Sequence, residues 1–197
     1  MTVPDHVTHY HLPDRDPFLN LSDLDGDRVH EVHEVMRELN ELRRLGVQRR
    51  PFGRTYLEWR LLTEVRLREL FVIAGGKPER TAPHYFVLGD SPWFEGLAAG
   101  MRAVRVPLSA LAPAKTSFTL VDSFSAMGLG PQFGFPAAAQ DHQRRVYLLD
   151  ELAHVIEQFG LPIGDTAADY TGFEQQTVEA YVEVQLWADQ PVQHLLR

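Results

Sequence analysis

The segment VEAYVEVQLW, residues 178–187, constrains the fold more than any other stretch, because apolar residues alternate with polar and aromatic ones. Side chains along a β-strand point to opposite faces in turn, so this pattern predicts a strand. One predicted face is apolar and consists of Val178, Ala180, Val182, Val184 and Leu186. The other is mixed and consists of Glu179, Tyr181, Glu183, Gln185 and Trp187. The apolar face predicts a buried core, whereas the mixed face fits either a solvated strand surface or the wall of a binding site.

Two helices are expected in the first part of the chain. Residues 25–45 carry apolar side chains three and four apart, and Gly46 offers a left-handed cap. Residues 55–73 form the second expected helix, which Gly75 and Gly76 end. On this second helix the ladder Arg60, Glu64 and Arg68 is expected on the outer side, with Tyr56, Trp59, Leu62 and Leu70 facing inward.

Short strands dominate the rest of the chain. They are expected at residues 7–12, 84–89, 104–108, 116–121 and 145–149, with a helix from residue 150, where Asp150 is the expected N-cap. Helices first and strands later favour an α+β fold: an N-terminal helical arm plus a mixed, mainly antiparallel β-sheet with short helices. We expect one domain over residues 1–197, helix-rich over 22–76 and strand-rich over 84–197.

Composition narrows the classes of function. The 197-residue chain has no cysteine, which excludes disulfides, thiolate nucleophiles and zinc sites that need sulfur. A net charge of −8 argues against bulk binding to nucleic acid. No apolar run reaches the roughly 20 residues that cross a bilayer, and the N-terminus lacks a signal-peptide pattern. The expectation is a cytoplasmic protein with no membrane partner.

Metal binding and a binding loop are weaker expectations. His9 and His11 share a strand face, and His30 with His33 share a helix face, but neither pair has a third ligand at a defined spacing. We therefore assign no metal ligands, although a His/Asp/Glu metal-dependent enzyme stays an alternative. The stretch 123–143 contains Phe133 and Phe135 and is interpreted as a binding loop or as a mobile excursion.

The mixed strand face carries the most specific chemistry. Glu183 lies mid-strand between Tyr181 and Gln185, and a carboxylate among aromatic rings can orient a ribose hydroxyl or stabilise developing positive charge. The first strand adds the ring pair Tyr10-His11. The central strand adds the hydroxyls of Ser117 and Thr119.

These motifs together resemble the ADP-ribosyltransferase superfamily: Tyr-His on an early strand, Ser-x-Thr on a central strand and E-x-Q on a late one. The order of PHYFVLGDSPWF, VRVPLSAL and SFTLVDSFSAM is also similar to the middle of DNA-modifying members. The resemblance implies a split β-sheet whose cleft binds NAD as substrate. It implies Glu183 as the catalytic residue, with Tyr10, His11, Ser117, Thr119, Tyr181 and Gln185 as NAD-binding or cleft-supporting residues.

The predicted function is therefore that of an ADP-ribosyltransferase-like enzyme that transfers ADP-ribose or releases nicotinamide. The partner is a small-molecule dinucleotide, and the sequence leaves the acceptor and the oligomeric state open. A non-catalytic interaction or inhibitor module is the alternative from another class, in which the mixed face of residues 178–187 is an ordinary strand surface.

Overall fold

The structure is a computed structural model, and it describes residues 3–24, 29–47, 53, 55–130, 144–161 and 181–196. Its strands are β1 (His6–His11), β2 (His84–Leu88), β3 (Arg102–Pro107), β4 (Thr116–Thr119), β5 (Tyr147–Leu148) and β6 (Glu183–Leu186). Its α-helices are α1 (Val29–Arg44), α2 (Tyr56–Ile73), α3 (Pro92–Glu95), α4 (Ser123–Ala126) and α5 (Leu152–Phe159). These elements confirm the predicted α+β fold class.

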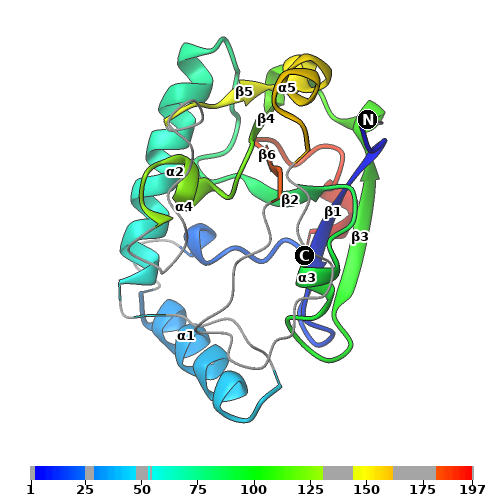
Figure 1. The fold of residues 1–197 in the computed structure, drawn as a ribbon. Helices are drawn as coiled ribbons and strands as arrows, with labels where there is room; N and C mark the ends of the chain where they lie inside the picture. The colour runs from blue at the N-terminus through cyan, green and yellow to red at the C-terminus, as the bar shows by residue number, and fades with distance from the viewer. Residues whose placement is uncertain are drawn as a thin grey trace.

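The strands form one six-stranded antiparallel sheet in the order β3-β1-β2-β6-β4-β5. The last strand, β6, lies in the middle of the sheet between β2 and β4 (Figure 1). Its register places Glu183 opposite Val87 and Thr119, and Gln185 opposite Tyr85 and Ser117. The strand predicted from the alternation is therefore confirmed over Glu183–Leu186, while residues 178–180 lie outside the described residues.

One face of the sheet is the main hydrophobic core. The side chains of Val184 and Leu186 are fully buried there. They pack with Phe86 and Phe118 of the neighbouring strands and with residues of α5. The apolar face of β6 is therefore confirmed as core.

The other face of the sheet is covered by α2 and α4 (Figure 1). Leu67 and Phe71 of α2 pack against Trp187 and against the α4 region, and these three side chains are fully buried. Helix α1 extends this layer, because its Val32 packs with Tyr56 of α2. The mixed face of β6 is thus also inside the protein and does not face solvent.

Glycines end two helices as the sequence predicts. Gly46 follows α1 at a φ of 73°, and the amide of Val47 donates to the Leu42 carbonyl, as in a Schellman cap. After α2, Gly75 has a φ of 101°, and a Cβ on Gly76 would lie 2.3 Å from the Phe71 ring. Gly75 thus supplies the left-handed residue that ends the helix, and only glycine fits at position 76 so close to the Phe71 ring.

The orientation of α2 differs from the expectation. Arg60 and Glu64 were expected outside, yet they are 8% and 2% exposed and face the sheet. Leu62 was expected inside, yet it is 59% exposed. The helix lies over the polar face of β6, and the residues that complement that face are charged. The N-cap of α5 also differs, since it is Glu151 and not Asp150.

Candidate functional site

The sheet splits between β1 and β2. These strands pair over two residue pairs only, Val7 with Leu88 and Thr8 with Val87, whereas β1 pairs with β3 along its whole length. Figure 1 shows β1 and β3 running together at a steep angle to β2. A pocket of about 370 Å³ lies at this split, lined by residues 8–12 on one side and 83–87 on the other. We call it the cleft pocket.

The cleft pocket brings together some of the predicted site residues. Tyr10, His11, Tyr181 and Glu183 all line it. Ser117, Thr119 and Gln185 do not line it. These three are fully buried beside Glu183, on the same sheet face.

Glu183 is 6% exposed, and both of its carboxylate oxygens are hydrogen-bonded. The Tyr181 hydroxyl donates to Oε2 at 3.4 Å, and the Gln185 amide nitrogen donates to Oε1 at 3.2 Å. Burial raises the pKa of Glu183, and nearby Asp122 adds to this, while Arg60 and hydrogen bonds from Ser123 and Gln185 act against it. The result is a desolvated carboxyl group at the wall of a pocket.

Gln185 holds Glu183 in place through a network of buried hydrogen bonds. Its amide oxygen accepts from Ser117 Oγ at 2.8 Å, and its nitrogen also donates to Thr119 Oγ1 at 3.2 Å. Trp187 Nε1 in turn donates to Ser117 Oγ at 2.8 Å. These contacts make Ser117, Thr119 and Gln185 supports of the carboxylate, while the roles predicted for Ser117 and Thr119 at an NAD cleft stay predictions. Direct contact of Gln185 with a ligand stays a prediction.

Arg60 supplies the positive charge at this site. Its Nε lies 3.1 Å from Glu64 Oε1, and its guanidinium lies over the Tyr85 ring, 3.8 Å from the ring centre. The Tyr85 hydroxyl donates to the same Glu64 oxygen at 3.0 Å. Burial raises the pKa of Glu64, and Arg60 acts against that rise. One buried guanidinium therefore serves two buried carboxyl groups, Glu64 and Glu183.

Helix α4 connects Arg60 to Glu183. Asp122 caps the helix by accepting a hydrogen bond from the Ser125 amide at 3.0 Å, which fixes the first residue, Ser123. Arg60 Nη1 donates to Ser123 Oγ at 3.3 Å. Ser123 also acts to lower the pKa of Glu183, so this helix contacts the guanidinium and favours the ionised carboxylate.

Aromatic rings form another wall of the cleft pocket. Tyr10 stacks on Phe94 with ring centres 5.6 Å apart, and Tyr181 meets Phe94 edge-on at 5.1 Å. The Ser91 amide donates to the Tyr10 hydroxyl at 2.8 Å, while the Ser91 side chain caps α3, which carries Phe94. Burial raises the pKa of Tyr10 to about 12, so the hydroxyl stays protonated. This wall suits a flat ring of a ligand.

His9 bridges the split in the sheet. Its Nε2 accepts from the Phe18 amide at 3.0 Å, so Nδ1 carries the proton and donates to the Tyr85 carbonyl at 2.9 Å. Burial is the main cause that lowers the pKa of His9, to about 4. A neutral imidazole thus replaces the backbone hydrogen bonds that β1 and β2 lose where they separate.

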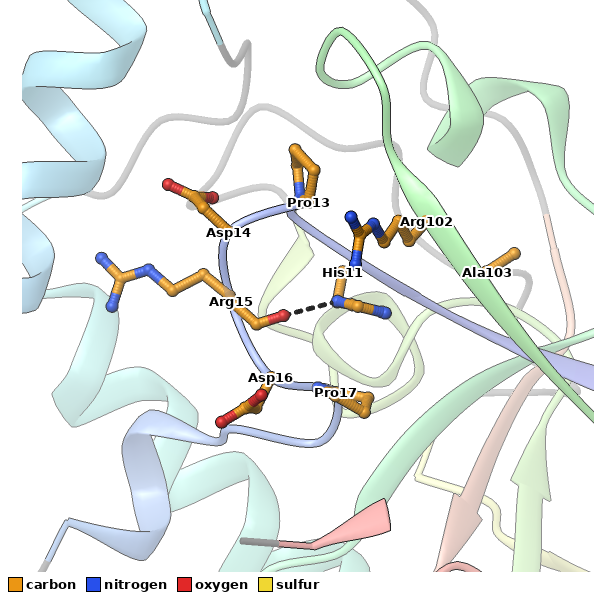
Figure 2. A pocket seen from close by; sticks show the side chains of 8 residues that line it. All are labelled: His11, Pro13, Asp14, Arg15, Asp16, Pro17, Arg102 and Ala103. Atoms are coloured by element: carbon orange, nitrogen blue, oxygen red, sulfur yellow. Dashed lines mark hydrogen bonds between the residues drawn. The ribbon is translucent and has the colours of Figure 1, made fainter.

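His11 lies on the opposite sheet face from Tyr10, at the edge of the cleft pocket. Its Nδ1 bonds the Arg15 carbonyl at 2.8 Å (Figure 2). It also lines an open, polar pocket of about 630 Å³ together with Arg102. Figure 2 shows the Arg15 side chain pointing away from His11, and its guanidinium pairs with Glu38 of α1. His11 therefore lines the cleft pocket from the sheet face opposite to that of Glu183.

Sequence reasoning missed Arg60, His9 and Phe94. The spacing of Arg60 and Glu64 is the same for a solvated ladder and for a buried ion pair, so it cannot separate the two. The other side of the same helix is also apolar, with Leu61 and Leu62, so it gave no clear signal. A helix with apolar residues all round cannot be sorted into an inside and an outside by polarity alone.

Two further observations concern the described part of the chain. There, no three His, Asp or Glu side chains group closely enough to hold a metal ion. No helix in those same residues has the length and apolar character to cross a membrane. Phe133 and Phe135 of the predicted binding loop lie outside the described residues.

Comparisons with protein-family models, curated proteins and solved structures found no match for this chain. The geometry of the cleft pocket is therefore what indicates a function.

Proposed function

We propose that the protein binds NAD in the cleft pocket and cleaves its nicotinamide–ribose bond, passing ADP-ribose to an acceptor or to water. One observation carries the proposal: Glu183, Tyr10, His11 and Tyr181, which come from distant parts of the chain, line one pocket. The pocket opens where the sheet splits, which is also what the resemblance to ADP-ribosyltransferases implies.

The size and lining of the pocket support a ligand with a flat ring and a polar end. A volume of about 370 Å³ is at the lower end of the roughly 300–1,000 Å³ usual for small-molecule sites. The nicotinamide-ribose half of NAD fits this description, with its ring against the wall of Tyr10, Phe94 and Tyr181 and its ribose toward Glu183. The adenosine half then lies toward the pocket mouth.

The chemistry follows from a desolvated carboxylate. When the bond between ribose C1′ and the nicotinamide nitrogen breaks, the electron pair leaves with neutral nicotinamide, and positive charge develops on the ribose. An ionised Glu183 stabilises that charge, more strongly than it would in water. Water or an acceptor then bonds C1′ and gives up its proton. Tyr181 and Gln185 hold the carboxylate, and Arg60 favours its ionised form.

Nicotinamide release from NAD tests the proposal. We expect Glu183→Gln to lower the rate about a hundredfold or more, because a neutral amide cannot stabilise the developing charge. We expect the wild-type rate to rise with pH through the raised pKa of Glu183, since the carboxylate is the active form. Glu157→Gln, on the exposed side of α5, is the matched control and should keep the wild-type rate. Equal release by Glu183→Gln and wild type would overturn the proposal, as would wild-type protein that neither cleaves NAD nor shows a thermal shift with it.

A further inference from the structure

Helix α2 carries apolar side chains on its outer side as well as on its buried side. Its buried side includes Arg60, Thr63 and Glu64, which serve the site. Its outer side carries five exposed apolar side chains: Leu61 (44% exposed), Leu62 (59%), Val65 (58%), Val72 (49%) and Ile73 (78%). Exposed apolar side chains gathered on one helix face are typical of interaction surfaces. We call these five residues, with Glu69 between them, the outer stripe of α2.

The outer stripe has a symmetric spacing. Counted from Leu67, its residues stand at −6, −5, −2, +2, +5 and +6: Leu61, Leu62, Val65, Glu69, Val72 and Ile73. With about 100° of rotation per residue, they spread evenly about the direction opposite Leu67, which is fully buried. A stripe whose spacing is the same from either end suits a second copy of itself, because a two-fold axis matches one patch with an identical patch.

We infer that the protein forms a two-fold dimer in which two α2 helices pair antiparallel through their outer stripes, with the axis level with Leu67. Leu61 then faces Ile73 of the partner, Leu62 faces Val72, and Val65 faces Glu69. Intervals of three, four and three residues separate Leu62, Val65, Glu69 and Val72, which is the spacing along a coiled-coil seam. This surface is separate from the cleft pocket, so the dimer does not depend on the proposed function.

The charges beside the stripe also fit a second copy. Arg66 and Glu69 are exposed and pair within one chain at 3.1 Å. In the antiparallel pair, Glu69 comes within about one residue rise, roughly 1.5 Å along the axis, of the level of the partner's Arg66. Two arginines and two glutamates thus alternate around the axis with no net charge.

Sedimentation equilibrium of the full chain over a range of concentrations tests the dimer. We expect a dimer for the wild type and a dissociation constant about a hundredfold or more higher for Val65→Glu, which places a carboxylate against the partner's Glu69. Leu45→Glu, at an equally exposed apolar side chain after α1, is the matched control and should not change the constant. A wild type that stays monomeric, or a dimer that Val65→Glu leaves intact, would overturn the inference.

Disulfide trapping tests the pairing itself, and it is clean because the chain has no cysteine. A mixture of Leu62→Cys and Val72→Cys proteins should form a disulfide-linked heterodimer under mild oxidation. Neither protein alone should form a disulfide-linked dimer quickly, because the two identical cysteines of such a homodimer lie roughly 15 Å apart along the helix axis. Equal trapping of each single variant with itself would show a different register or a parallel pair, and would overturn the antiparallel arrangement.

Discussion

The two faces of β6 are both buried, but they are buried by different means. On one face Val184 and Leu186 need only close-packed apolar neighbours, which the main core supplies. On the other face Glu183 and Gln185 need a partner for each polar atom. Tyr181 and β4 supply hydrogen bonds, and Arg60 of α2 supplies positive charge. Burial of a charge without a partner costs far more than burial of apolar surface gains. The polar face is therefore the part of the fold that has to be explained by function.

Arg60→Met should have the largest effect and should show how the polar face differs from the core. Removing the guanidinium leaves Glu64 and Glu183 without a cation, which should lower the free energy of unfolding by about 3–5 kcal/mol at neutral pH. Both carboxyl groups already have raised pKa values, so each binds a proton more readily in the folded state than in the unfolded chain. The loss should shrink as pH falls toward the pKa of an unfolded glutamate, because protonation removes the unpaired charges.

Phe118→Ala is the matched control on the apolar face, where Phe118 is fully buried. It should also cost about 3–5 kcal/mol, but by the same amount at every pH, since no charge is involved. Urea unfolding of both variants at several pH values measures the difference. A loss for Arg60→Met that does not change with pH would show that its charge does not stabilise the two carboxyl groups.

His84, on the apolar face, should contribute to stability with a pH dependence opposite to that of Glu64 and Glu183, because its pKa is lowered and theirs are raised. His84 is 2% exposed, and its Nε2 lies 3.1 Å from Asp189. Burial, with a smaller contribution from Arg80, lowers its pKa to about 4, although Asp189 acts against this. The folded state therefore resists protonation, and stability falls as pH drops from about 6.5 to 4, by roughly 3 kcal/mol at most. His84→Gln should remove that part of the acid sensitivity. A variant as acid-sensitive as the wild type would contradict the assignment.

The sequence predicted where helices and strands lie better than it predicted what each of their faces packs against. Alternation over residues 178–187 identified both the central strand and its apolar face, because burial repeats every second residue in a strand. It could not decide whether Glu183 faces water, since that depends on α2, more than 100 residues earlier in the chain. The same limit placed Arg60 and Leu62 on the wrong sides of α2. Local spacing determines which residues share a face, while tertiary packing determines where that face points.

Ser117→Ala should have the smallest effect, and its neighbour offers a direct comparison of the two faces. The Ser117 hydroxyl accepts from Trp187 Nε1 and donates to Gln185, so the variant leaves two buried polar atoms unsatisfied. That should cost about 1–3 kcal/mol and loosen Glu183 through Gln185. Thr116 is the matched control, since its buried hydroxyl oxygen has no hydrogen-bond partner among the described residues.

Thr116→Val keeps the shape of the side chain and replaces only that hydroxyl with a methyl group. The free energy of unfolding of this variant should therefore rise, or fall by less than about 0.5 kcal/mol. The two residues are adjacent in β4 and equally buried, which leaves the face as the only large difference between them. Equal losses for the two variants would mean that the polar network around Gln185 adds nothing to stability. A loss confined to Ser117→Ala would mean that the hydrogen bonds below Glu183 hold the polar face in place, and that the catalytic position proposed for Glu183 depends on them.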